Sequence, residues 1–223
     1  LNKLKTETEQ RKISKFDTLP IYLVMEYIPN VDKPLDDYSR QNWIDIGKIM
    51  AFDILINNWD RLPLIWENEG NVENILFTPS GDVKAIDQSI TGIYEKQAGV
   101  YIEKIENLFE QLKILDHNNF SENPPQCFEK LIVCFQALGY DISSDLKHIG
   151  QGIMEGAVAI AESIDTDQLQ TIYNELEAEV MSMINLMTFA FDLARLYGLK
   201  RVNVAFLVDV LQIFKKYQLP FSQ

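Results

Sequence analysis

Residues 56–89 read INNWDRLPLIWENEGNVENILFTPSGDVKAIDQS, and this stretch decides the fold. Its segments VENILF and VKAID are short and rich in apolar residues, and the Pro-Ser-Gly-Asp segment 79–82 between them consists of turn formers. This pattern predicts two short strands joined by a tight turn. The segment before the hairpin, residues 60–71, has no periodicity and predicts an irregular loop.

Upstream of this stretch the sequence predicts a strand and then a helix. Residues 21–28, IYLVMEYI, form an aromatic and β-branched run between two prolines, which is typical of a buried strand that leads into an extended linker. From Ser39 onward the apolar residues follow helical spacing. They place Trp43, Ile46, Met50 and Ile54 on one face, together with Asp53. The Asn57-Asn58 pair ends this predicted helix.

Downstream of the hairpin nearly all of the chain has a helical pattern. We expect helices at residues 97–115, 124–138, 144–163, 166–196 and 203–217, with Ser143 and Asp165 as N-caps. Small residues at Gly152, Gly156 and Ala159 indicate close approach of two helices, because no strand precedes them as in a phosphate-binding loop. The expected fold class is therefore α+β, mainly α, with one small hairpin.

The composition indicates a folded domain and disfavours two classes of partner, nucleic acid and membrane surfaces. The chain has 223 residues, of which 47% are hydrophobic and 24% charged, so a folded domain is expected. Its formal net charge of −13 repels phosphate backbones and anionic lipid, which makes nucleic acid and membrane surfaces poor partners. Only two cysteines are present, and no run of 18 apolar residues occurs. We expect a cytoplasmic location and no zinc site.

Three polar residues stand where phosphoryl transfer would need them. Asp60 follows the long helix, Asn74 opens the hairpin and Asp87 closes it. Antiparallel strands of similar length return the chain to its starting end, so Asn74 and Asp87 are expected to lie close together. Each residue alone is more typical of a surface ion pair, a turn former or a strand end. Their combination in this order predicts a base and two oxygen ligands for a metal.

The motifs LVMEYI (23–28), INNWDRLPLIW (56–66), GNVENILF (70–77) and AIDQS (85–89) resemble those of the actin-fragmin kinase catalytic domain, an atypical protein kinase family. The resemblance implies a kinase-like C-terminal lobe, ATP with Mg²⁺ or possible Mn²⁺, and phosphorylation of actin on threonine, particularly in the actin-fragmin complex. It implies Asp60 as the catalytic base, with Asn74 and Asp87 as metal ligands. It also implies association with the cytoskeleton, and a hinge that contacts adenine through Met25, Glu26, Tyr27 and Ile28.

The sequence departs from the general kinase pattern at several points. Asn74 follows Asp60 by 14 positions, whereas about five separate the two residues in ordinary protein kinases. The loop LPLIWENEG (62–70) is thus an insertion, which Pro63 and Trp66 would either pack against the core, the expected arrangement, or present to a protein substrate. Asp-Gln-Ser replaces Asp-Phe-Gly, so regulation through a phosphorylated activation loop is not expected.

The organisation expected from these motifs is an inter-lobe segment and hinge strand at residues 1–30 and a kinase-like large lobe at 31–223. No glycine-rich phosphate loop precedes the hinge, and the chain begins with Leu1, so we expect the N-terminal lobe to be absent and the isolated chain to have little activity. Two alternatives stay open. One is a non-catalytic kinase-like interaction module, and the other is a lipid or small-molecule kinase of related fold. Oligomeric state is not predicted.

Overall fold

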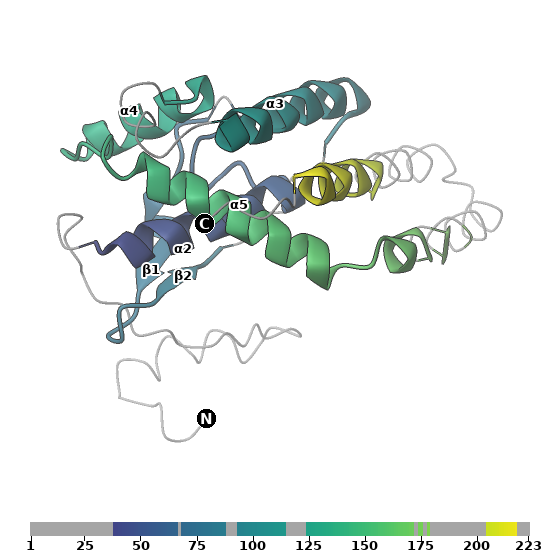
Figure 1. The fold of residues 1–223 in the computed structure, drawn as a ribbon, viewed down its shortest axis with the longest axis horizontal. Helices are drawn as coiled ribbons and strands as arrows, with labels where there is room; N and C mark the ends of the chain where they lie inside the picture. The colour runs from purple at the N-terminus through teal and green to yellow at the C-terminus, as the bar shows by residue number, and fades with distance from the viewer. Residues whose placement is uncertain are drawn as a thin grey trace, which may run out of the picture.

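The computed structural model describes residues 38–66, 68–87, 93–114, 124–171, 174–175, 178 and 204–217. Within them the chain forms four labelled α-helices, two 3₁₀ turns and one hairpin (Figure 1). In chain order these are α2 (Arg40–Ile56), η2 (Val72–Asn74), β1 (Ile75–Phe77), β2 (Val83–Ala85), α3 (Glu95–Ile114), η3 (Gln126–Phe128), α4 (Glu129–Ala137) and α5 (Leu146–Ser163). Residues 204–216 are also helical.

Helix α2 has well-defined ends. Ser39 is its N-cap, and the Ser39 hydroxyl accepts a hydrogen bond from the backbone N–H of Asn42 while the Asn42 side chain accepts one from the backbone N–H of Ser39. At the other end Asn57 has a left-handed backbone with φ of 53°, and its N–H donates to the carbonyls of Asp53 and Ile54. The helix therefore stops where the Asn57-Asn58 pair predicted.

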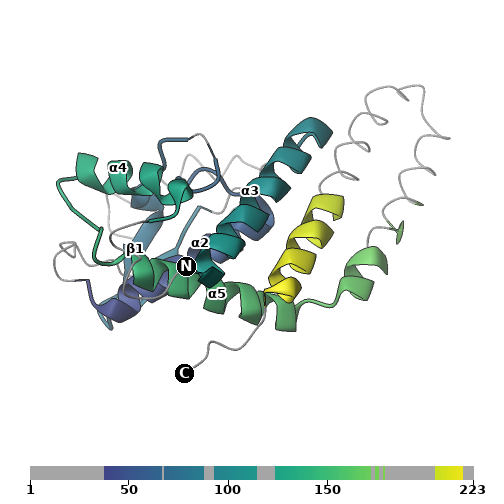
Figure 2. The same cartoon turned by 45° about the horizontal axis from the view of Figure 1, so that its top comes forward.

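Among the labelled elements that the structure describes, helices α2 and α5 pack against each other most extensively, and both views show them crossing (Figures 1 and 2). The contact is backbone to backbone, since a Cβ on Gly47 would meet the Ile149 carbonyl oxygen at 2.2 Å and a Cβ on Gly152 would meet the Ile44 carbonyl oxygen at 2.0 Å. Gly152 therefore permits close helix approach as predicted. Ala159 is exposed, so it takes no part in this contact.

The hairpin lies beside the first turns of α2. Ile75 pairs with Ala85 and Phe77 with Val83, in antiparallel register. The turn closes because the Thr78 N–H donates to the Asp82 carbonyl at 3.0 Å, with Gly81 at φ of 88°. The Asn42 amide donates to the Gly81 carbonyl at 2.8 Å, and this bond ties the turn to the helix.

The remaining helices complete the core. Helix α3 lies beside the C-terminal helix 204–216 in both views (Figures 1 and 2), where the Phe109 ring packs against the rings of Phe214 and Tyr217. Phe128 of η3 and Leu131 of α4 are fully buried in the same core. Among the residues that the structure describes, no helix is both long and apolar enough to cross a membrane.

The predicted mainly helical fold with one small antiparallel hairpin is confirmed for the part of the chain that the structure describes. Asp165 directly precedes the helical residues that begin at 166, and its carboxylate accepts from the Asp167 N–H at 2.8 Å, so it acts as the N-cap there as predicted. Ser143 is wrong as an N-cap, since Asp145 occupies that position in α5 and the Ser143 hydroxyl donates to Asp141 instead. The strand expected at 21–28 lies outside the described residues.

Candidate active site

Asp60 lies on an exposed turn directly beyond α2, held by a buried group of polar side chains. Its backbone N–H donates to the Asn58 Oδ1 atom at 3.3 Å. The Asn58 amide in turn donates at 2.9 Å to Oδ1 of Asp53, on the last turns of the helix. Because Asn58 and Asp53 are at most 1% exposed, the backbone of Asp60 is hydrogen-bonded to a buried side chain, while Asp60 itself is exposed to solvent.

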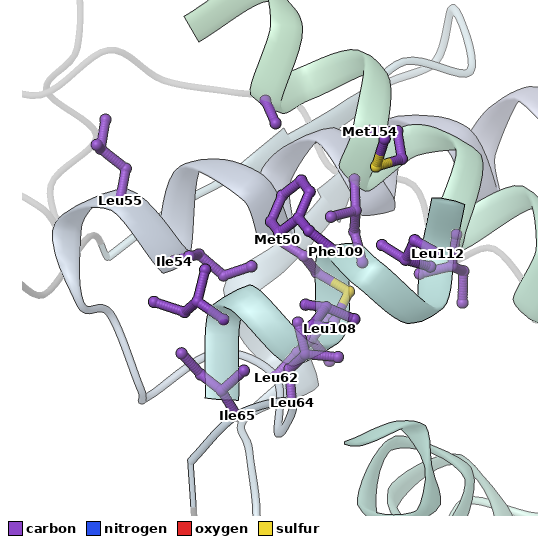
Figure 3. Packing of buried hydrophobic residues seen from close by; sticks show 14 of the residues in the cluster. Met50, Ile54, Leu55, Leu62, Leu64, Ile65, Leu108, Phe109, Leu112 and Met154 are labelled. Carbon is purple, nitrogen blue, oxygen red and sulfur yellow. The ribbon is translucent and has the colours of Figure 1, made fainter. Parts of the chain in front are cut away.

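The insertion after Asp60 packs into the core. Leu62, Leu64, Ile65 and Trp66 are 2–3% exposed, and the labelled side chains of the first three point toward Met50, Ile54 and Leu108 in Figure 3. The Trp66 indole N–H donates to the Asn57 side chain at 2.9 Å. For these described residues the expected packed arrangement is confirmed.

The two ends of the insertion meet. The Asn71 N–H donates to the Arg61 carbonyl at 2.7 Å, so the chain closes on itself between these residues. Gly70, at φ of 79°, makes this return possible, because a Cβ there would lie 2.6 Å from the Pro63 ring. Closure explains how Asn74 can return to Asp60 despite the long separation in sequence.

Asn74 is 6% exposed and ends η2 at the entrance to β1. Its amide nitrogen lies 3.4 Å from Oδ2 of Asp60 and donates a long hydrogen bond to it. The backbone carbonyl of Asn74 accepts from the backbone N–H of Ile86 at 3.0 Å, which extends the hairpin ladder by one pair. The structure thus brings Asn74 together with Asp60 and with the residue that precedes Asp87.

Asp87 is exposed at the end of the hairpin and has a left-handed backbone, with φ of 54°. Its position is set through Ile86, whose carbonyl accepts from the Arg61 guanidinium at 3.0 Å. The antiparallel register places Asn74 and Asp87 at the same end of the hairpin, as predicted. The hinge residues Met25, Glu26, Tyr27 and Ile28 lie outside the described residues.

A buried ion pair between Arg61 and Asp53 lies next to this site. Arg61, which is fully buried, donates to Oδ1 of Asp53. Burial raises the pKa of Asp53 to about 6, and the charge and hydrogen bond of Arg61 oppose that rise. Since the arginine is permanently charged, we expect Asp53 to be ionised at neutral pH, with the pair neutral as a whole.

The oxygen donors at the hairpin end suit a hard cation. Within the described ranges no three His, Cys, Asp or Glu side chains gather as a possible metal site. The Asn74 amide oxygen and the Asp87 carboxylate could instead supply two ligands, because Mg²⁺ commonly takes one or two protein oxygens and completes its shell with phosphate and water. The donor chemistry therefore fits a metal carried by a nucleotide, rather than one caged by protein alone.

Sequence reasoning identified Asp60, Asn74 and Asp87 and missed the buried residues Asp53, Asn58 and Arg61 that hold them. The sequence pattern indicates only a helix face for Asp53 and a helix end for Asn58, and the Asp60-Arg61 pair taken alone is typical of a surface ion pair. A signal for Asp53 was present in the pattern, because a carboxylate stood at an apolar position of α2. A charged group in a buried stripe requires a partner of opposite charge, and Arg61 provides it.

Comparison with known proteins adds a family match. Residues 3–188 match the family described as "Actin-fragmin kinase, catalytic", which covers most of the chain and includes the whole cluster described above. The chain is also similar to a curated protein of Dictyostelium discoideum whose name places it among the actin-fragmin kinases, with 40% identity over 67 residues. That alignment covers 25% of this chain and 16% of the relative, so the chain corresponds to a small part of the relative's length.

Proposed function

Because this chain belongs to the actin-fragmin kinase catalytic family, we propose that it carries the large catalytic lobe of an ATP-dependent protein serine/threonine kinase. The proposed acceptor is a threonine of actin, particularly actin in complex with fragmin. The observation that supports this most is the short distance between the side chains of Asp60 and Asn74. They lie 3.4 Å apart although a packed insertion separates the two residues in sequence.

Asp60 is the proposed general base. Its carboxylate is exposed to solvent, so an acceptor hydroxyl could approach it, and its backbone is held by Asn58. In phosphoryl transfer the acceptor hydroxyl loses its proton as the new oxygen–phosphorus bond forms, and a positioned carboxylate can take that proton. The Asn74 amide would keep one carboxylate oxygen oriented through its hydrogen bond.

Asn74 and Asp87 are the proposed metal ligands. When bound there, Mg²⁺ would compensate the negative charge of the triphosphate. The protein's contribution is to hold both oxygen donors at one end of the hairpin, through the Asn74–Ile86 backbone bond and the Arg61–Ile86 bond. This arrangement favours a catalytic domain over a non-catalytic interaction module, which would need no such cluster.

We also propose the division of the chain expected from its motifs. Residues 31–223 would form the large lobe, and Met25, Glu26, Tyr27 and Ile28 would contact the adenine as a hinge. The net charge of −13 supports a protein acceptor over one embedded in anionic lipid, because the field of the lobe would oppose approach to such a surface.

Replacing Asp87 with asparagine should weaken metal-dependent nucleotide binding by about tenfold or more, because it removes a negative charge from the proposed metal site. Asparagine tolerates the left-handed backbone at this position better than alanine would. The measurement is titration of ADP by calorimetry, with and without Mg²⁺. Asp82→Asn is the matched control, since Asp82 is an exposed carboxylate in the turn of the same hairpin. Equal Mg²⁺-dependent affinities for both variants would remove Asp87 from the site.

The overall proposal is tested by incubating the full-length protein with γ-labelled ATP and purified actin, with and without fragmin. We expect Mg²⁺-dependent label on actin threonine, increased by fragmin. Label on inositol lipids or small alcohols, with none on protein, would instead support a lipid or small-molecule kinase. Absence of label on every acceptor, together with no binding of Mg²⁺–ATP, would support the non-catalytic module.

A further inference from the structure

We propose that Asp53 and Arg61 form a positioning bridge, a buried pair that holds the proposed base and the proposed metal-binding end of the hairpin in fixed relation. The inference rests on the proposed function and adds two residues that contact neither substrate nor metal directly. Both side chains are at most 2% exposed. One belongs to α2 and the other to the loop beyond it, so the bridge joins two elements with the hairpin.

One arm of the bridge leads to Asp60. The Asp53 Oδ1 atom accepts from the side-chain amide nitrogen of Asn58 at 2.9 Å, and the side-chain Oδ1 atom of Asn58 accepts from the backbone N–H of Asp60 at 3.3 Å. With both side-chain ends engaged, Asn58 cannot rotate without breaking a bond. The backbone of the proposed base Asp60 is therefore held in place by hydrogen bonds that lead to the C-terminal end of α2.

The other arm leads to Asp87. Arg61 donates through one terminal nitrogen to Asp53 and through the other to the Ile86 carbonyl at 3.0 Å. A planar guanidinium fixes the directions of these two bonds relative to each other. Lysine keeps the charge but has no such rigid fork. The arm thus sets the end of β2, from which Asp87 continues with its left-handed backbone.

The pair is poorly arranged for stability alone. Within the described residues, Oδ2 of Asp53 and Nε of Arg61 are buried and have no hydrogen-bond partner. Buried ion pairs are often replaced by apolar residues at no cost in stability. A charged pair with unused hydrogen-bonding capacity is better explained by where its remaining bonds point, which is toward the Asp60 and Asp87 backbones.

The two arms make separable predictions for the full-length protein. Arg61→Lys should lower the affinity of the protein–ADP complex for Mn²⁺ by about 10- to 100-fold, as expected when a residue that orients a metal ligand is changed. Asn58→Ala should leave that affinity within about twofold and lower phosphoryl transfer by about tenfold or more, because misplacement of a reacting group costs rate. Mn²⁺ binding is measured by electron paramagnetic resonance, which requires no turnover.

The double variant Asp53→Leu with Arg61→Met separates positioning from folding. It replaces the pair with apolar side chains and leaves the Asn58 amide and the Ile86 carbonyl without their partners. We therefore expect a folded protein whose melting temperature falls about as far as that of a buried Leu→Ala variant, while its Mn²⁺ affinity falls like that of Arg61→Lys. Leu131→Ala is the control for general destabilisation, since this buried residue of α4 lies outside the bridge. It should lower the melting temperature and leave Mn²⁺ affinity unchanged.

The outcomes distinguish this inference from the proposed function. Unchanged Mn²⁺ affinity in Arg61→Lys or in the folded double variant would overturn the bridge. A loss of affinity in Leu131→Ala equal to that in Arg61→Lys would overturn it as well. A wild-type protein that binds Mn²⁺–ADP but transfers no phosphoryl group to any acceptor would contradict the proposed function alone, and the Mn²⁺ measurements would still decide the metal arm.

Discussion

Asp60→Asn is expected to lower phosphoryl transfer by about 10²–10⁴-fold, the range that a positioned general base contributes. Asparagine has the shape of aspartate, and its carbonyl oxygen can still accept the hydrogen bond from Asn74. The loop should therefore keep its position while the group that accepts the proton is lost. We expect kcat to fall and the affinity for Mg²⁺–ATP to stay within about twofold, measured by steady-state kinetics and by calorimetry on the full-length protein.

Glu73→Gln is the matched control for this variant. Glu73 is an exposed carboxylate next to Asn74, so its replacement removes one negative charge from the same neighbourhood without touching the proposed base. It should retain nearly full activity. If Asp60→Asn and Glu73→Gln both turn over at the wild-type rate, Asp60 is not the base. A parallel loss in both variants would point to the local charge rather than to proton transfer.

The fold could be predicted from sequence where one local signal dominated. The end of α2 at the Asn57-Asn58 pair and the turn at Gly81 followed from residues that adopt a left-handed backbone. Ser143 failed as an N-cap because its hydroxyl had a competing acceptor two residues away, in Asp141. The sequence pattern did not point to Asp145, which the turn before α5 places at the N-cap position.

The site was predictable in part for a similar reason. Hairpin topology alone brings Asn74 and Asp87 to the same end. The approach of Asp60 to Asn74 depends on closure of the insertion, through the Asn71–Arg61 backbone bond and the left-handed Gly70. That closure relies on burial of Leu62, Leu64 and Trp66 in the core, which includes Leu108 of the distant helix α3. Pair contacts of this kind have no local pattern, and for the Asp53–Arg61 bridge the pattern shows the carboxylate in the apolar stripe but not its partner.

Gly152→Ala should destabilise the protein by at least about 3 kcal/mol, the upper part of the range for overpacking, because the added methyl group meets backbone rather than flexible side chains. Its Cβ would lie 2.0 Å from the Ile44 carbonyl oxygen and 2.9 Å from the Cα of Gly47. Helices α2 and α5 would have to separate to relieve this contact. For a protein of this size the loss corresponds to a fall in melting temperature of roughly 6–12 °C, measurable by circular dichroism.

Gly99→Ala provides the opposite expectation within the same chain. Gly99 lies in α3, and a Cβ there would have nothing within 4 Å. Alanine in an exposed helix position is favoured over glycine by about 0.5–1 kcal/mol, so this variant should melt at a slightly higher temperature. If the two variants melt together, the backbone contact between α2 and α5 does not hold. If Gly152→Ala alone is destabilised, the backbone contact holds the first half of α2 against α5 at Ile44 and Gly47.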